Sequence, residues 1–197
     1  MSHLLQALSF LIQVAFGALA TLFLVRLLAE ATRADFHNPL SQFVYRYTNP
    51  VLAPVRRVLP NWRRINIAAL LVVWLVLLLE RVVTGALIGQ ILALPGLLVV
   101  AAADLLDFVL LFYIIVIFGW SLLSMLSADP YQPIVRLAGT IVQPLLRPLR
   151  GKLVAGNLDF SPMVVMIVLV LARILIAAPL FDLGMELGLG VHFVRPG

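Results

Sequence analysis

Five charged residues lie within or beside long apolar runs of this sequence, and they are the first candidates for chemistry. An ionisable side chain at the centre of a membrane span costs about 2.5–3.5 kcal/mol on insertion scales, so such residues often mark ion or proton pathways. Two interpretations are open: a functional polar site between two halves of the chain, or a set of structural ion pairs. The five residues are Glu80, Arg81, Asp104, Asp107 and Arg173.

The spacing of these residues predicts which of them meet. Arg81 and Asp104 are nearly equidistant from a glycine-containing break at residues 89–96, so a helical hairpin turning there brings them to equal depth. Asp104 and Asp107 are three positions apart and share one face of a helix. We therefore expect Arg81 to lie against Asp104 or Asp107.

A second group of residues is basic and lies in two segments punctuated by proline. All but one of the 14 basic residues are arginines, and the planar arginine fork suits phosphate groups. The segments are either connectors whose charges only fix the membrane topology, or a docking surface for a partner or for anionic lipid. The candidate contact residues are Arg56, Arg57, Arg63, Arg64, Arg147, Arg150 and Lys152.

Other chemistry has little support in the sequence. The chain has no cysteine, which excludes disulfides and thiol catalysis. No pair among His3, His37 and His192 has metal-ligand spacing, and no phosphate-binding loop, nucleophile elbow or zinc-protease motif occurs. We predict no catalytic residue, no cofactor and no metal, and hence no enzyme.

Composition indicates an integral membrane protein. Of the 197 residues, 63% are hydrophobic and 12% are charged, whereas about 25% are charged in soluble domains. Nucleic-acid binding is disfavoured, because the basic residues adjoin apolar runs long enough to span a bilayer instead of covering a soluble domain.

The two proline-containing segments are copies of one another. A shift of 94 positions superimposes three prolines, a leucine and an arginine, and the removal of one residue then aligns residues 65–67 with 158–160. Glu80 and Arg173 fall at matching positions. We predict two repeats, residues 1–92 and 93–197. The superimposed pairs are Pro39 and Pro133, Pro50 and Pro144, Leu52 and Leu146, Pro54 and Pro148, Arg56 and Arg150.

The fold class predicted is an all-α membrane protein with four transmembrane helices, as a tandem repeat of helix, amphipathic proline-rich segment and helix. The first span covers residues 4–25, and the last begins at Ser161 and continues to about Pro179. The run at residues 82–103 is either part of a hairpin between two long helices, which we prefer, or a fifth span. After Phe181 we expect a short surface helix or a frayed tail.

Within each basic segment, apolar residues recur at helical spacing. Proline lacks an amide donor and clashes with the preceding turn, so we expect Pro50 and Pro144 each to end one short amphipathic helix and begin another. Such helices would lie in the headgroup layer. The first segment holds six basic residues, the second four and the tip of the hairpin none, which predicts both segments in the cytoplasm and both termini outside.

The segments resemble the signature of the YggT family. The resemblance covers both halves, and it departs from the family pattern at Ala53 and at residues 66–69 of the first copy. The matching stretches are NPLSQFV at residues 38–44, PVRRVLP at 54–60, QPLLRPLR at 143–150 and LDFSP at 158–162.

The resemblance implies a small multi-pass protein of the bacterial inner membrane, with relatives in plastids. Members are associated with envelope organisation and division, with osmotic or ion homeostasis, and with cytochrome maturation in plastids. No agreed biochemical activity accompanies the family.

Two functional hypotheses follow. The first is a non-enzymatic scaffold or assembly factor whose basic segments bind anionic lipid headgroups or a cytoplasmic or membrane protein. The alternative is a subunit of a small ion channel or transporter that uses the charged cluster, which would require a homo-oligomer because four helices offer few polar pore-lining residues.

Overall fold

The computed structural model describes residues 2–59, 61, 65–126, 129, 131–155 and 158–190. Arg63, Arg64 and His192 lie outside these residues. The described chain is almost entirely helical, and four of its helices are long and apolar enough to cross a membrane. The all-α class and the four spans are therefore confirmed. The span candidates are α1 (Ser2–Ala31), α3 (Ile67–Ile88), α4 (Leu94–Met125) and a composite of α6 (Ser161–Ala172), η1 (Arg173–Ala177) and α7 (Ala178–Leu189).

The run at residues 82–103 belongs to a hairpin, as preferred above. Helix α3 ends at Gly89, whose backbone is left-handed with φ 73°, and its amide donates to the carbonyls of Ala86 and Gly85. Only glycine adopts this conformation without strain, which is why the helix stops there. Helix α4 then begins at Leu94 with Pro95 in its first turn.

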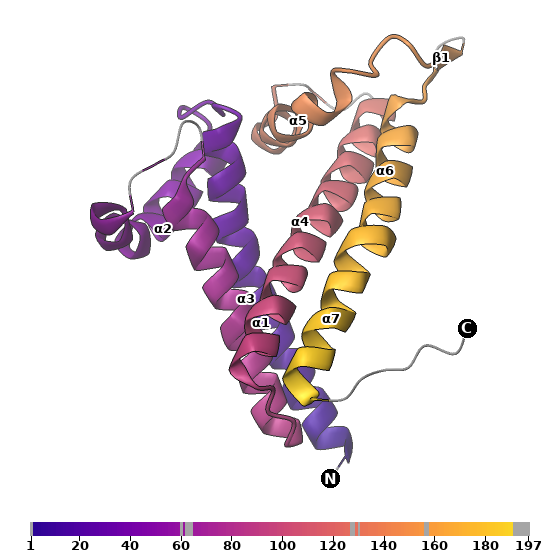
Figure 1. Cartoon of the computed structure of the whole chain (residues 1–197). Coiled ribbons are helices and arrows are strands. Elements are labelled where there is room, and N and C mark those ends of the chain that lie inside the picture. Colours follow the sequence, from indigo (N-terminus) through magenta and orange to yellow (C-terminus); the bar gives the residue numbers. More distant parts are fainter. Residues whose placement is uncertain are drawn as a thin grey trace.

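Two further helices, α2 (Pro39–Val58) and α5 (Pro133–Leu146), form the basic segments. Both lie at the end of the bundle opposite the α3–α4 turn, the start of α1 and the end of α7 (Figure 1). Each is amphipathic, with buried residues on one face such as Val44 and Leu52 in α2. The even number of crossings between the two segments is consistent with their shared side.

The expected helix breaks at Pro50 and Pro144 were wrong. Helix α2 runs unbroken through Pro50 and Pro54, and α5 runs two residues beyond Pro144 before turns take over. These prolines all lie on the exposed face of their helix. A proline there frees the carbonyl four residues earlier, and that carbonyl also lies toward the surface, where water or headgroups can satisfy it. The cost of the missing bond is thereby reduced.

The expected surface tail was also wrong, because the last span continues through α7 to Leu189. One wide π turn, η1, lies between α6 and α7, and the amide of Ala178 donates to the carbonyl of Arg173 five residues earlier. Pro179 follows in the first turn of α7, where its lack of an amide is tolerated.

Glycines explain why the end of this span is packed instead of frayed. A Cβ atom at Gly96 of α4 would overlap the backbone nitrogen of Gly188, and one at Gly184 would meet the Val100 side chain at 2.7 Å. The Ala93 amide also donates to the Gly188 carbonyl at 2.9 Å. Gly184 and Gly188 are therefore contact residues that allow α4 and α7 to approach closely.

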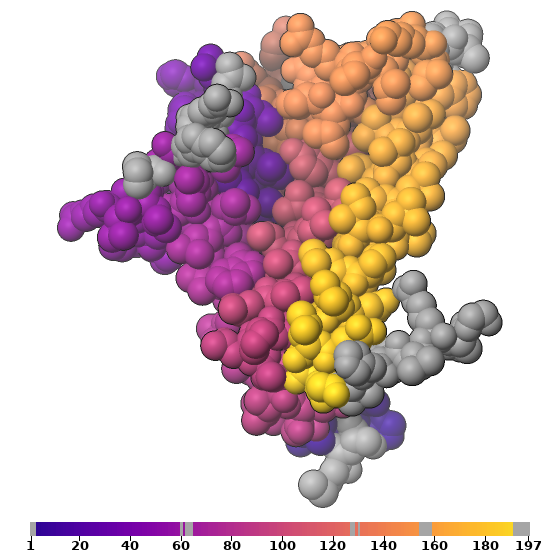
Figure 2. Space-filling model, in the orientation of Figure 1, coloured from indigo at the N-terminus to yellow at the C-terminus, as the bar shows by residue number. Residues whose placement is uncertain are grey.

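The chain between α5 and α6 caps the ends of two spans. It contains turns and a two-residue antiparallel hairpin of β1 (Val154–Ala155) and β2 (Leu158–Asp159). Figure 2 shows this orange segment seated over the start of α6. The Ser161 hydroxyl donates to the Leu149 carbonyl at 2.9 Å, and the Phe160 amide donates to that of Leu153 at 2.9 Å. These bonds join the segment to the start of α6.

Candidate functional site

The hairpin ion pair expected from the sequence is present. The Arg81 guanidinium of α3 donates from Nε to Asp104 Oδ2 at 3.0 Å and from Nη2 to Asp104 Oδ1 at 2.7 Å. This two-pronged contact is the strongest geometry available to an arginine–carboxylate pair. The guanidinium carbon also lies 5.2 Å from the ring centroid of Phe181 in α7, so one side chain links three helices.

A second pair of the same kind lies one turn further along α4. Arg173, the first residue of η1, donates to the two carboxylate oxygens of Asp107 at 2.6 and 2.9 Å. Asp104 and Asp107 share one face of α4, as predicted, and each has its own arginine. Glu80 forms no ion pair with any residue in the described part of the chain.

These pairs involve four of the five candidate residues, Arg81, Asp104, Asp107 and Arg173. A cavity of about 250 Å³ lies beside them, lined by Ala103, Asp104, Asp107, Ala177 and Phe181. No group of three or more potential metal ligands occurs among the described residues. The arrangement fits a structural role in which the two pairs hold α3, α4 and η1 at one depth. Among the five candidates, Glu80 is the one without an ion pair in the described part of the chain.

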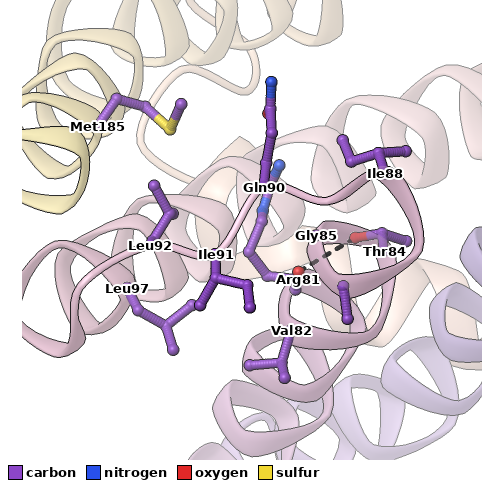
Figure 3. A pocket seen from close by; sticks show the side chains of 11 residues that line it. Arg81, Val82, Thr84, Gly85, Ile88, Gln90, Ile91, Leu92, Leu97 and Met185 are labelled. Carbon is purple, nitrogen blue, oxygen red and sulfur yellow. Dashed lines mark hydrogen bonds between the residues drawn. The ribbon is translucent and has the colours of Figure 1, made fainter.

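A small pocket of about 160 Å³ lies on the other side of Arg81, next to the α3–α4 turn (Figure 3). Its walls are mainly apolar, with Ile88, Leu97 and Met185 at the periphery. The hydroxyl of Thr84 is turned back to the helix and bonds the Glu80 carbonyl at 2.7 Å. The pocket therefore offers little chemistry beyond the already paired guanidinium.

At the opposite end of the bundle, the two basic helices touch. The Asn38 side-chain amide donates to the Pro133 carbonyl at 2.7 Å, and Arg136 of α5 pairs with Asp35 at 3.0 Å. Hydrogen bonds from His37, the backbone amide first, lower the pKa of Asp35 and keep it ionised. These contacts join the start of the α2 segment to the start of α5, so the two helices lie beside one another across the two halves of the chain. We call the exposed face of these two helices the basic surface.

The candidate contact residues divide into two kinds. Arg56 is half-buried and pairs with Glu30 at 2.6 Å, so its charge is engaged within the protein. The others that the structure describes are exposed, and they are joined by exposed basic residues that the sequence had not singled out. The exposed basic residues around the basic surface are Arg33, Arg46, Arg57, Arg136, Arg147, Arg150 and Lys152.

A buried polar cluster that sequence reasoning missed is centred on Glu30. Its carboxylate accepts hydrogen bonds from Arg26 at 2.8 Å, from Arg56 at 2.6 Å and from Asn66 at 2.7 Å. The ring of Tyr45 lies over the Arg26 guanidinium, 3.1 Å from the centroid to the guanidinium carbon. Three elements of the first repeat, α1, α2 and the start of α3, are therefore joined through one carboxylate.

Burial makes this cluster expensive to disrupt. Arg26 is 1% exposed, and its Nε and Nη1 atoms have no partner among the described residues. Burial, then the neighbouring Glu30 carboxylate, raises the pKa of Tyr45 to about 12, so this phenol stays neutral. The sequence signal was an arginine and a glutamate four positions apart at the charged end of the first span.

Comparison with known proteins agrees with this architecture. The sequence model of the family described as CCB3/YggT matches residues 5–87 and 99–180. The first match runs from α1 to the end of α3, and the second runs from α4 to the start of α7. The chain belongs to the CCB3/YggT family. The family match spans both copies of the repeat.

Curated relatives carry the same family resemblance over most of their length. The uncharacterized protein YggT of Escherichia coli is 31% identical over 168 residues, covering 84% of this chain and 86% of the relative. The uncharacterized protein PA0392 of Pseudomonas aeruginosa is 33% identical over 159 residues, covering 78% and 79%. An uncharacterized protein of Vibrio alginolyticus is 32% identical over 181 residues, covering 87% and 94%. No solved structure matches the chain.

Proposed function

We propose that this chain is a non-enzymatic scaffold or assembly factor of the inner membrane, and that its basic surface faces the cytoplasm. In this proposal the surface binds an acidic partner, either a protein or anionic lipid headgroups. The termini lie outside, because short loops rich in arginine are retained in the cytoplasm. The repeat division at residues 92 and 93 stays a prediction, as does assembly into a homo-oligomer.

The observation that carries the proposal is the contact between α2 and α5. If the basic segments were only topological anchors, they would have no need to join. The hydrogen bond from Asn38 to Pro133 and the Arg136–Asp35 pair instead unite them into a single surface. Each arginine near an anionic membrane contributes about 1 kcal/mol of attraction, so several exposed on one face favour a docking role.

The assignment as a non-enzyme rests on what the charged residues do. Four intramembrane charges are engaged in two-pronged ion pairs, and Glu30 is held by three donors. A general acid, base or nucleophile needs access to a substrate, whereas these carboxylates are occupied by side chains of the protein itself.

Ion or solute transport remains the alternative, and Glu80 is the observation that favours it. This carboxylate lies inside a span without an ion pair in the described part of the chain, close to the Arg81–Asp104 pair. Flux through liposomes that falls on changing Glu80→Gln would support transport, and a Glu186→Gln variant provides a matched control near the end of the last span.

The proposal is tested by crosslinking and mass spectrometry in native membranes. Arg57→Glu with Arg147→Glu places one reversed charge in each copy, and both residues are exposed. We expect crosslinks from the basic surface to an acidic protein to disappear, whereas Arg57→Lys with Arg147→Lys retains them because charge is kept. If no protein crosslink depends on charge, binding to vesicles containing phosphatidylglycerol tests the lipid form. If the charge-reversed variant keeps both the protein crosslinks and the binding to vesicles, the proposal is rejected.

A further inference from the structure

The two copies of the repeat differ at the position of the buried carboxylate. With the shift of 94 positions that superimposes the prolines, Glu30 corresponds to Ser124, and Arg56 corresponds to Arg150. The second copy therefore keeps the arginine but lacks the carboxylate that binds it in the first. No ion pair or side-chain hydrogen bond of Arg150 occurs in the described part of the chain.

The two copies also differ at a neighbouring pair of positions. In the first copy the Tyr45 ring lies over the Arg26 guanidinium. In the second copy Gly139 stands at the position of Tyr45, and Trp120 stands at the position of Arg26. A Cβ atom at Gly139 would lie 2.9 Å from the Trp120 indole nitrogen, so the large ring now comes from the transmembrane helix. The second copy thus has no buried cation at this position and no phenol above it.

At the place that corresponds to the Glu30 cluster, the second copy has a cavity of about 740 Å³ between α4, the start of α6 and the segment after α5. Ser124 and Arg150 both line it, as does Asp159, the counterpart of Asn66. The hydroxyl oxygen of Ser121 in the same wall is buried and has no hydrogen-bond partner among the described residues.

The polar rim of this cavity holds one positive and one negative charge that do not pair with each other at ion-pair distance among the described contacts. Asp159 accepts the Ser161 amide at Oδ1 at 2.9 Å, and a carboxylate has further acceptor sites for a ligand. Hydrogen bonding from Ser161, together with the charge of Arg150, lowers the pKa of Asp159 and keeps it ionised. A ligand that satisfies both groups must carry both charges.

The rest of the cavity is apolar and lies along the spans. Phe118 and Leu122 occupy the last two turns of α4, and Met163 occupies the first turn of α6. Their exposed fractions are 54%, 43% and 49%, so this part is open toward the hydrocarbon region beside the helices. From Ser161, where α6 begins, to Met166 the helix rises about 8 Å, which is room for the upper part of an acyl chain.

We propose that this cavity binds one zwitterionic, amine-bearing phospholipid from the leaflet next to the basic surface, with its phosphate at Arg150, its ammonium group at Asp159 and an acyl chain along Phe118 and Met163. The lipid phosphate takes the place that the Glu30 carboxylate has in the first copy. Arginine suits phosphate because it can bind two oxygens at once. The flexible methionine side chains suit an apolar chain of variable shape.

This site shares Arg150 with the basic surface but differs from it in place and in net charge. Docking uses the outer face of α2 and α5 and requires net positive charge, whereas the cavity is electrically balanced and opens beside α4 and α6. The docking variant Arg57→Glu with Arg147→Glu changes no residue that lines the cavity, so it is expected to leave lipid retention unchanged.

Native mass spectrometry of the full chain in detergent tests the proposal, with equimolar phosphatidylethanolamine and phosphatidylglycerol of the same acyl chains as probes. We expect one tightly retained phosphatidylethanolamine, preferred about tenfold over phosphatidylglycerol, as one additional charge-assisted contact predicts. Equal retention of the two lipids, or preference for phosphatidylglycerol, would overturn the proposal.

Two variants locate the bound lipid. Ser124→Glu restores the carboxylate of the first copy beside Arg150, and we expect it to reduce retention at least tenfold, whereas Leu126→Glu adds the same charge outside the cavity and does not. Asp159→Asn keeps an oxygen for the Ser161 amide and is expected to reduce the preference between the two lipids to near unity. Met163→Trp, which fills the apolar part, provides an independent test if Ser124→Glu unfolds. Unchanged retention in folded Ser124→Glu or Met163→Trp would place the lipid elsewhere.

Discussion

Glu30 and Arg56 lie 26 positions apart, in a transmembrane helix and in the amphipathic helix beside it, and their side chains meet at 2.6 Å. The same carboxylate holds Arg26, which is almost completely buried. The orientation of the first basic segment on the membrane is therefore fixed by a carboxylate inside the protein. This contact has consequences for stability that can be measured.

Glu30→Gln is expected to destabilise the fold strongly. The substitution leaves the buried Arg26 charge without a counter-charge, and breaking one side of a buried pair costs roughly 3–5 kcal/mol. Thermal unfolding in detergent measures the effect. Asp35→Asn, which removes a carboxylate from an exposed pair with Arg136, is the matched control and is expected to cost less than about 1 kcal/mol. An equal loss of unfolding free energy in the two variants would show that the Glu30 cluster contributes no more to stability than the exposed pair.

The raised pKa of Tyr45 predicts that the folded protein loses stability at alkaline pH. Its pKa is raised to about 12 in the folded protein, against about 10 for an unfolded chain. The folded state therefore holds this proton more tightly, and the resulting stability is present below about pH 10 and is lost between about pH 10 and 12. Tyr45→Phe cannot titrate, so its melting temperature is expected to fall less over this interval than that of the wild type. Parallel pH curves would contradict the assignment.

The Arg81–Asp104 pair predicts coupling across the hairpin. Arg81→Ala is expected to destabilise the wild type more than it destabilises an Asp104→Ala background, because the two-pronged contact is already lost there. Residues in direct contact typically couple by about 0.5–3 kcal/mol. Unfolding free energies of the four proteins complete the cycle. Strict additivity would mean that the two side chains do not interact in solution.

The close approach of α4 and α7 predicts that a single methyl group is harmful at one glycine and harmless at another. Gly96→Ala forces the backbones of the two helices apart, because its Cβ atom would overlap Gly188. Gly17→Ala in α1 meets no atom within 4 Å, and there alanine is favoured over glycine by about 1 kcal/mol. We expect a lower melting temperature for the first variant and an unchanged or higher one for the second. The reverse order would contradict the packing of the last span.

The spans, the hairpin at Gly89 and the Arg81–Asp104 pair could be predicted because they depend on local apolar length and on symmetry about a turn. The course of α2 through Pro50 could not, since it depends on which face of the helix the proline occupies. The continuation of the last span past Phe181 was missed because Gly184 and Gly188 suggest flexibility until their partner Gly96 is known. The Glu30 cluster required the tertiary positions of Arg56 and Asn66, which no local pattern reports.

The difference between the two copies was also inaccessible from the sequence alone. The alignment shows that Ser124 stands at the position of Glu30, but a serine there is unremarkable by itself. Its meaning depends on the surroundings of Arg150, which include a cavity in place of a carboxylate. A repeat can therefore keep its fold while one copy closes a site with its own side chains and the other leaves it open.

The central claim is that α2 and α5 present one basic surface on the cytoplasmic side of the membrane. Because the chain has no cysteine, single cysteines can report the side of each segment without further changes. Gln42→Cys in α2 and Ile134→Cys in α5 are exposed positions, and Gln90→Cys, also exposed, marks the α3–α4 turn. With an impermeant thiol reagent added to intact cells, we predict labelling of Gln90→Cys alone, and labelling of the other two only after the membrane is permeabilised. Labelling of Gln42→Cys or Ile134→Cys in intact cells would contradict the claim.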